Sequence, residues 1–157
     1  MPDPTAYPAF GEPVLAMIDG AVVRASGWRR DHRARANTAG VVYMMIEGML
    51  RELGGPGFIV GNHVTIRGDD GVYATVVHLQ RGSVSVARGQ RVSAGQQIAR
   101  CGNSGNTSEP HVHAQLMDRA SLWTAQGLPL AFSGIRTSGA SEPLDGVPAN
   151  EEHLLAT

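Results

Sequence analysis

The chain has no lysine, a single cysteine and no long apolar run, and each absence excludes a class of protein. All 13 basic residues are arginine and 14 residues are acidic, so the near-neutral charge argues against nucleic acid or an anionic membrane as partner. The lone Cys101 cannot form an internal disulfide, and we expect a small buried residue beside Gly102. The longest apolar run, residues 41–46, is far below the roughly 20 residues of a membrane span.

The two ends of the chain also lack features. Residues 1–8 contain neither the basic region nor the apolar region of a secretory signal, so we expect no export signal in this sequence. After Phe132 the sequence turns to serine, glycine and threonine, which bury little apolar surface. We therefore predict one domain over residues 1–132 and a disordered tail over 133–157.

Short strand-like runs separated by glycine turns make up most of the predicted domain. Residues 12–25 indicate two strands joined in a hairpin at Asp19-Gly20, and residues 63–67 and 72–79 indicate a second antiparallel pair. Further strands are expected at residues 84–86, 91–92, 97–99 and 111–117. The pattern predicts a mainly β fold, a small antiparallel β-barrel or sandwich, with one helical insertion.

The insertion covers residues 28–60. An arginine-rich segment, residues 29–35, is expected to be a solvated loop, although it could meet an anionic polymer. Thr38 would then cap a helix over Ala39–Leu53, which stops at Gly54-Gly55. The helix carries an apolar stripe that could form a lid, a dimer contact or a partner groove, but we expect it to pack on the sheet. The stripe consists of Met44, Met45, Met49 and Leu50.

Three histidines are placed so that they could meet. His111 and His113 are separated by one residue, so on an extended strand both side chains point to the same side. His78 lies near the end of the strand predicted over residues 72–79. Three imidazoles on one sheet suggest zinc chemistry. The other histidines, at positions 32, 63 and 153, are expected to be surface or hydrogen-bonded residues.

Several motifs occur in a characteristic order over more than half the chain. They are Pro13-Val-Leu-Ala16, Asp19-Gly-Ala-Val-Val23, Gly61-Asn-His-Val-Thr-Ile66, Tyr73-Ala-Thr-Val-Val-His-Leu79, Val86–Ile98 and Gly102–His113. In this combination the sequence resembles the LytM/lysostaphin-type zinc endopeptidases of peptidase family M23. The resemblance implies a fold of the duplicated hybrid motif type, a Zn²⁺ cofactor, and a peptide of cell-wall peptidoglycan as substrate.

The resemblance also implies roles for the histidines. His113 would be the third zinc ligand, and His78 and His111 the two catalytic histidines that do not bind zinc. The family's first two ligands come from a His-x-x-x-Asp motif just before the Pro-Val-Leu-Ala strand, but only Asp3 offers an acidic candidate there, without a histidine. We therefore expect a truncated N-terminus and an inactive chain as printed. The family works mostly at the cell envelope, which leaves the localisation open because no export signal is present.

Parts of the sequence are also compatible with functions other than that of a peptidase. A non-enzymatic relative could keep the fold without zinc and bind wall peptides or regulate a partner hydrolase. The glycine-spaced pattern at residues 86–98 also resembles biotinyl and lipoyl carriers, but those need a lysine and the chain has none. A phosphohistidine carrier that uses His78 and His111 stays open as a third alternative.

Overall fold

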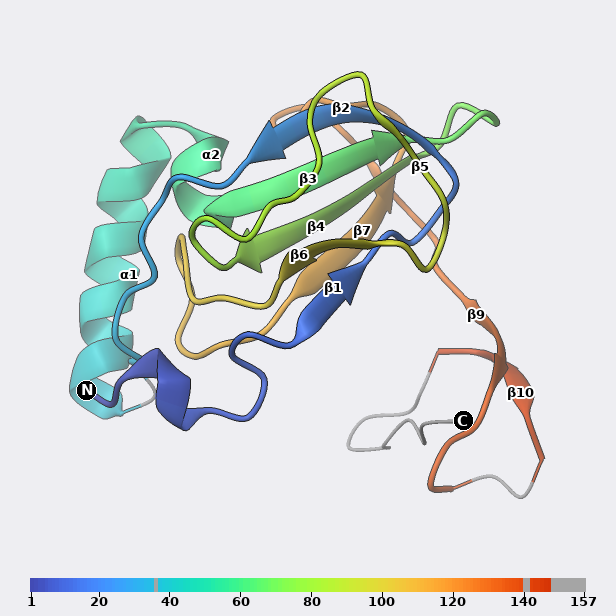
Figure 1. Cartoon of the computed structure of the whole chain (residues 1–157). Coiled ribbons are helices and arrows are strands. Elements are labelled where there is room, and N and C mark those ends of the chain that lie inside the picture. Colours follow the sequence, from blue (N-terminus) through green and yellow to red (C-terminus); the bar gives the residue numbers. More distant parts are fainter. Residues whose placement is uncertain (36, 140–141, 148–157) are drawn as a thin grey trace. The chain divides into compact units, whose positions relative to one another are not determined.

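The computed structural model describes residues 1–35, 37–139 and 142–147 and divides the chain into two compact units, residues 1–127 and residues from 128 onward. The first unit is built on a six-stranded sheet (Figure 1). In order across the sheet, the strands are β5 (Arg91–Val92), β2 (Gly20–Ser26), β3 (Asn62–Arg67), β4 (Tyr73–Leu79), β7 (His113–Met117) and β8 (Gly127–Leu128).

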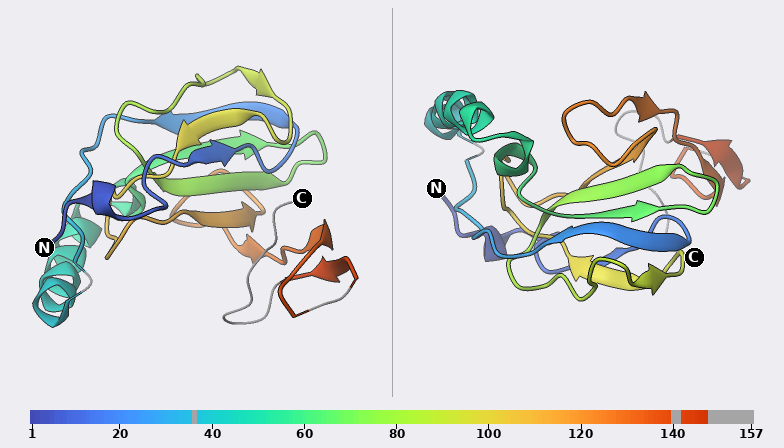
Figure 2. Two further views of the ribbon diagram at one scale, coloured as in Figure 1. Left: turned by 60° about the horizontal axis from the view of Figure 1, so that its bottom comes forward. Right: turned by 90° about the horizontal axis from the view of Figure 1, so that it is seen from above.

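A second sheet covers one face of the first. It consists of β1 (Pro13–Leu15) and β6 (Gln97–Arg100), which pair antiparallel, and it lies across the large sheet in both views of Figure 2. Val14 and Ile98 from the small sheet join Val22, Val64 and Leu79 from the large sheet in one buried apolar cluster. Burial of this cluster is the main force that holds the two layers together. The mainly β fold class is confirmed as a sandwich, since the described strands form no closed barrel.

The central strands follow the predicted pattern. β3 and β4 pair antiparallel with Val64 opposite Val76 and Thr65 opposite Thr75. Val64 and Val76 belong to the core, whereas the Thr65 and Thr75 hydroxyls, 3.0 Å apart, are buried on the opposite face. Residues 84–86, predicted as a strand, lie in a loop, and the last central strand begins at His113 rather than at residue 111.

The predicted hairpin at Asp19-Gly20 is wrong. β1 pairs with β6, and β2 pairs with β3 and β5, so the two strands belong to different sheets. Asp19 lies in the connection between the sheets, where its carboxylate accepts the backbone N–H of Ala94 at 2.8 Å. An Asp-Gly pair signals a local turn, but here the long-range pairing of β1 with β6 decides the topology.

The insertion holds two helices where one was predicted. α1 (Thr38–Leu53) ends at the predicted residue, but Asn37 caps it: the Asn37 Oδ1 accepts the backbone N–H of Gly40 at 2.8 Å, one residue before the expected cap. α2 (Pro56–Val60) follows at once and begins with a proline at its first turn, where the missing N–H costs nothing. Five residues are too few for a periodic signal, which is why the sequence did not reveal α2.

The apolar stripe of α1 does not pack on the sheet, which corrects the expectation from the sequence. Met45 is 64% exposed, Met49 is 72% exposed and Leu50 is 64% exposed. The side of α1 that meets the body carries Gly48, where an added Cβ would lie 2.9 Å from the Asn106 side chain. Small residues allow this close approach, and α1 stands beside the sandwich (Figures 1 and 2). Its long apolar side chains are largely exposed.

The second unit contains one antiparallel hairpin within the stretch predicted as a disordered tail. β9 (Phe132–Ile135) pairs with β10 (Leu144–Gly146). Residues 148–157, the rest of that predicted tail, lie outside the described residues. Across the residues that the structure describes, no helix has the length and apolar character needed to cross a membrane.

Candidate functional site

His78 is the most constrained histidine of the site. It lies at the end of β4, is 3% exposed and adopts a φ of 64°, a left-handed conformation that no other described residue except glycine shows. Its Nδ1 lies 2.8 Å from the carbonyl oxygen of Ser104. Since a carbonyl only accepts, Nδ1 donates and Nε2 carries the lone pair. Such strain persists only where the surroundings impose it, and it is typical of functional sites.

His111 and His113 approach His78 from the neighbouring chain segment. His113 is opposite Val77 in the pairing of β4 with β7, which places it next to His78. His111 precedes β7, so its position comes from the loop before the strand and not from the strand alternation that predicted it. The His111 Nδ1 lies 2.7 Å from the carbonyl oxygen of Glu109 and 3.1 Å from the Thr107 hydroxyl.

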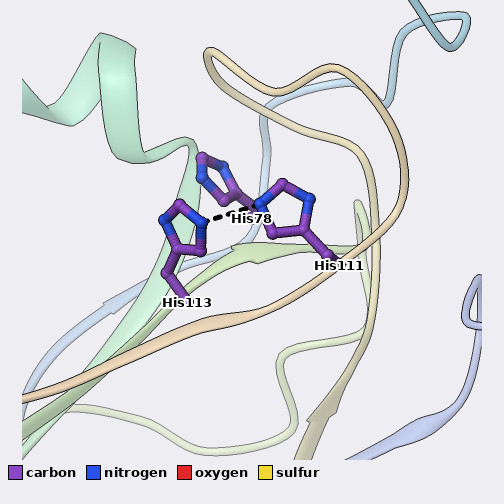
Figure 3. Close-up of side chains that lie close together, drawn as sticks. All are labelled: His78, His111 and His113. Carbon is purple, nitrogen blue, oxygen red and sulfur yellow. Dashed lines mark hydrogen bonds between the residues drawn. The ribbon is translucent and has the colours of Figure 1, made fainter. Parts of the chain in front are cut away.

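The three imidazoles form one cluster (Figure 3). Their ring centroids are 4.5 to 5.1 Å apart, and one nitrogen from each ring lies within 4.8 Å of the others. The Nε2 atoms of His111 and His113 are 2.9 Å apart, which is hydrogen-bond distance. The predicted convergence of His78, His111 and His113 is therefore present.

The electrostatics of the cluster favour neutral rings at His78 and His113. Burial, and to a smaller extent the positive charges that His111, His113 and His32 would carry, lower the pKa of His78 to about 4. The pKa of His113 is also lowered, first by burial and then by His111. Metal ions bind the neutral imidazole, so protons compete weakly with a metal at these two residues. By donor type and charge, His113 is suited to be a zinc ligand, with His78 and His111 close beside it.

Asp3, the acidic candidate for a second ligand, does not join the cluster. Its carboxylate caps a short 3₁₀ helix, η1 (Pro4–Ala6), by accepting the backbone N–H and the hydroxyl of Thr5 at 3.0 and 2.6 Å. No carboxylate in the described part of the chain belongs to the group of possible metal ligands. The His63 Nδ1 lies 2.9 Å from the carbonyl oxygen of Gly61, as a hydrogen-bonded residue would. The described residues thus supply three imidazoles and no acidic ligand.

The comparison with known families agrees with this geometry. The sequence profile described as peptidase family M23 matches residues 5–124. The chain belongs to peptidase family M23. This confirms the resemblance found in the motifs from Pro13 to His113.

Individual relatives of this M23 chain include two peptidases. It is 32% identical over 103 residues to the peptidoglycan DD-endopeptidase ShyA of Vibrio cholerae, a match that covers 61% of this chain and 24% of that protein. The chain therefore spans about a quarter of the length of that curated relative. The solved catalytic domain of the antimicrobial peptidase lysostaphin from Staphylococcus simulans has a TM-score of 0.51 at 27% identity, and the match covers 75% of this chain and 68% of that domain.

In this M23 domain, the loop that carries His111 is held by a close crossing of two glycines. Gly61 and Gly105 have φ angles of +68° and +88°, and an added Cβ on either would lie 2.4 Å from a backbone oxygen of the other segment. The backbone N–H of Asn62, next to this crossing, donates a hydrogen bond to the Ser104 hydroxyl at 3.0 Å. Ser104 is the residue whose carbonyl orients His78, so the crossing fixes the ring indirectly.

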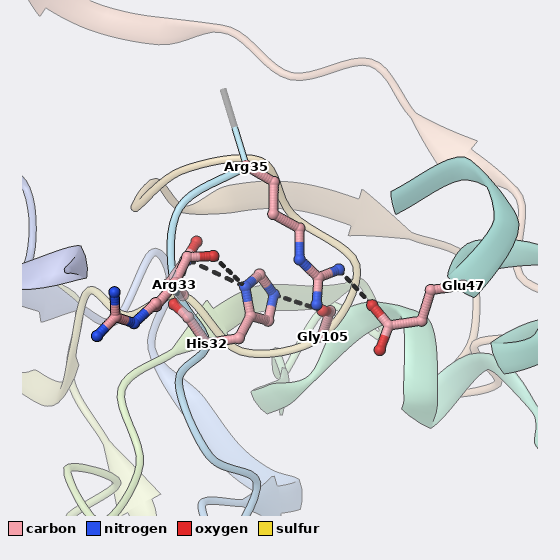
Figure 4. A network of polar contacts seen from close by, with 6 residues as sticks. His32, Arg33, Arg35, Glu47 and Gly105 are labelled. Carbon is pink, nitrogen blue, oxygen red and sulfur yellow. Dashed lines mark hydrogen bonds and ion pairs between the residues drawn. The ribbon is translucent and has the colours of Figure 1, made fainter. Parts of the chain in front are cut away.

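The arginine-rich segment of the insertion also holds this loop (Figure 4). The Asp31 carboxylate accepts the backbone N–H groups of Asn103 and Arg81 at 2.7 and 2.9 Å. The two ring nitrogens of His32 lie 2.9 Å from the carbonyl oxygens of Arg33 and Gly105. The backbone N–H of Arg35 donates to the carbonyl of Ser108. Residues 31–35 therefore hold the loop that carries His111, and we name them the latch segment.

The latch segment was expected to be a solvated loop, and for Arg35 that expectation is wrong. Arg35 is buried, forms an ion pair with Glu47 on α1, and stacks with its guanidinium carbon 4.7 Å from the Tyr43 ring centroid. A buried guanidinium needs such partners because desolvation of an unpaired charge is costly. An arginine-rich stretch gives no sign of this in the sequence, since the partners lie 12 and 8 residues further along on a helix.

A hollow opens beside the histidine cluster. His113 lines it together with Val60 at the end of α2, Thr75 and Val77 on β4, and Leu122 and Ala125 in the loop after β7. The walls are mostly apolar, with the Thr75 hydroxyl and the Gln115 amide as polar groups.

Proposed function

We propose that this chain carries the catalytic face of a zinc-dependent endopeptidase that cuts peptides of cell-wall peptidoglycan. One observation carries the proposal: His78, His111 and His113 converge within 4.8 Å beside a hollow that an extended peptide can reach. Membership of family M23 and the identity to a peptidoglycan DD-endopeptidase support the substrate class.

The residues divide the work by their hydrogen bonds. His113 would hold the zinc, which when bound polarises the scissile carbonyl and lowers the pKa of a water. His78 and His111 would not bind it. The Nδ1 of each ring lies against a backbone carbonyl, at Ser104 and at Glu109, so Nε2 carries the lone pair. It could accept a proton from the attacking water and, once protonated, donate a hydrogen bond to the developing oxyanion. With its depressed pKa, His78 stays neutral and able to accept a proton at neutral pH.

We further propose that these 157 residues alone do not hydrolyse peptidoglycan. The described residues supply imidazoles but no acidic ligand, and Asp3 is engaged as a helix cap. A single ligand from His113 would hold zinc weakly against water and other ligands. A non-enzymatic wall-binding module is the second candidate, and the same absence of an acidic ligand among the described residues favours it.

The test compares the 157-residue chain with an extended chain. In the extended chain, residues 1–11 are replaced by a segment that carries the family's His-x-x-x-Asp motif before Pro13. Zinc is counted by elemental analysis after dialysis, and hydrolysis is followed by chromatography on a pentaglycine peptide and on cross-linked peptidoglycan fragments. We expect substoichiometric zinc and no hydrolysis from the 157 residues, and zinc-dependent hydrolysis from the extended chain.

Matched variants separate the two candidates. His113→Ala in the extended chain should abolish both zinc binding and hydrolysis, whereas His78→Ala should abolish hydrolysis and retain zinc. An extended chain that binds zinc and cuts neither substrate would contradict the endopeptidase. Hydrolysis by the unextended chain, lost in His113→Ala, would show that the proposed inactivity is wrong. Peptidoglycan binding without hydrolysis in either chain would favour the wall-binding module.

A further inference from the structure

A second hollow lies next to the one beside His113. Arg24, Arg29 and His63 line it, together with residues 54–58 and residues 121–123. Leu122 lines both hollows, and α2 borders both, with Val60 at the first and Pro56 at the second. A peptide that occupies the first hollow can therefore continue into the second.

The second hollow is positively charged. Two guanidinium groups line it, and none of its lining residues is acidic. The effect is visible at His63, whose pKa is lowered first by burial and further by the positive charges of Arg24 and Arg29. Arg24 is exposed, and no ion pair or hydrogen bond of its side chain is found among the described residues. The hollow thus offers cationic donors to a ligand.

Arg29 is held in place before any ligand arrives. Its backbone N–H donates to the Asn62 Oδ1 and its carbonyl accepts from the Asn62 Nδ2, both at 2.8 Å, and Asn62 is fully buried. Its guanidinium carbon lies 4.6 Å from the Trp28 ring centroid and 4.0 Å from the Phe58 ring centroid. Stacking on two aromatic rings restricts the conformations of the Arg29 guanidinium, so its place at the wall of the hollow is set in advance.

Aromatic side chains flank the arginines. Trp28 is 67% exposed and Trp123 is 70% exposed, and these are the chain's two tryptophans. Trp123 lines the second hollow, and Trp28 lines a neighbouring one that shares Arg29 and Phe58 with it. Large exposed aromatic residues beside arginine are the composition typical of binding hot spots.

We propose that this second hollow is a subsite for a carboxylate-bearing residue of the peptide substrate, recognised by Arg24 and Arg29 and flanked by Trp123. The inference rests on the proposed function for the identity of the ligand as a peptide. Residues 29 and 54–58 belong to the insertion at 28–60. The insertion would therefore direct the domain toward anionic peptides and away from uncharged ones such as pentaglycine.

The test measures binding by the full chain without metal, so that it does not depend on hydrolysis. Two alanine-based pentapeptides that differ only in a central Glu or Gln are titrated by calorimetry, with the Trp123 indole N–H followed by NMR. We expect the Glu peptide to bind about fivefold more tightly at low salt, and the preference to shrink as salt is raised. Arg24→Gln and Arg29→Gln should each reduce the preference. Arg88→Gln, at an exposed arginine in the 87–90 turn, should leave it unchanged.

Each result decides between the claims. Equal affinity for the two peptides, no binding of either at millimolar concentration, or an equal effect of Arg88→Gln overturns the subsite. Since Arg24 is exposed, its variant remains informative even if Arg29→Gln disturbs the fold. Arginine-dependent preference in a domain whose extended form cuts nothing would retain the subsite and remove the endopeptidase. Hydrolysis without any preference would do the reverse.

Discussion

The crossing of Gly61 and Gly105 can be tested with a pair of substitutions that separates backbone strain from steric overlap. Gly105 and Gly89 have almost the same φ, +88° and +89°. A Cβ at Gly89 would meet nothing within 4 Å, whereas a Cβ at Gly105 would lie 2.4 Å from the Ile59 oxygen and 2.6 Å from the Gly61 nitrogen. Both of these atoms belong to the backbone, so no side chain can move to relieve the overlap.

The expected magnitudes follow from these distances. Gly89→Ala introduces only the left-handed conformation, which costs roughly 1–2 kcal/mol for a residue with a Cβ. Gly105→Ala adds the displacement of packed backbone, a further cost of about 1–3 kcal/mol. We therefore expect the free energy of unfolding to fall by about 1–3 kcal/mol more in Gly105→Ala than in Gly89→Ala.

Urea unfolding followed by tryptophan fluorescence measures both variants, because Trp28 and Trp123 both lie in the unit of residues 1–127. The displaced loop should also move the Ser104 carbonyl away from the His78 Nδ1, which imidazole NMR would report in Gly105→Ala alone. If the two variants lose the same free energy of unfolding within about 0.5 kcal/mol, the close crossing of Gly61 and Gly105 does not hold the loop that carries His111.

Three further predictions concern buried polar groups. Asn62→Leu removes three side-chain hydrogen bonds, to Arg29 N–H, Arg29 C=O and Leu79 C=O, and should lower the free energy of unfolding by about 2–4 kcal/mol. Gln126→Leu on the surface should change the free energy of unfolding by less than about 0.5 kcal/mol. Equal losses in the two variants would contradict the prediction. In the metal-free protein, the His78 pKa falls from 6.5 to about 4, so between these values the unfolded chain binds more protons and stability should drop by about 3 kcal/mol as the pH falls through that window. Urea titrations at several pH values should show that the free energy of unfolding depends less on pH in His78→Gln than in the wild type. An unchanged pH dependence in the variant would contradict the prediction. Burial raises the pKa of Cys101 to about 11, so a thiol reagent at pH 8 should label the unfolded chain and not the folded one, and fast labelling of the folded chain would refute the buried assignment.

Local sequence patterns predicted the bounds of strands and helices better than they predicted which strands pair with each other. The runs at residues 63–67 and 72–79 form β3 and β4, and the helix ends at Leu53, because alternation and glycine stops act within a few residues. The Asp19-Gly20 hairpin failed because the partner of β1, β6, lies more than 80 residues away. A turn signal carries no information about such a competitor.

The site shows the same division. The three histidines were found from spacing and motif, and their convergence was expected. The residues that orient them were not: Ser104 acts through a backbone carbonyl, and the side chains of Asn62, Asp31 and His32 bind backbone groups of distant segments. A side chain that binds a backbone atom can do so whatever side chain the partner residue carries. Such contacts therefore leave no characteristic pair of residue types by which a single sequence could reveal them.

The two ends of the insertion differ in how they could be exchanged between proteins. Residues 38–53 form a helix whose long apolar side chains are largely exposed, so α1 could be recombined as a cassette, with Asn37 as the junction. The latch segment could not travel separately, because Asp31, His32 and Arg35 all bind the loop that carries His111. Replacement of the helices would also strand Arg35 without Glu47, so a viable chimera must change Arg35 in the same step. Evolution of this insertion would face the same coupling: the helices could diversify freely only after the buried ion pair was replaced.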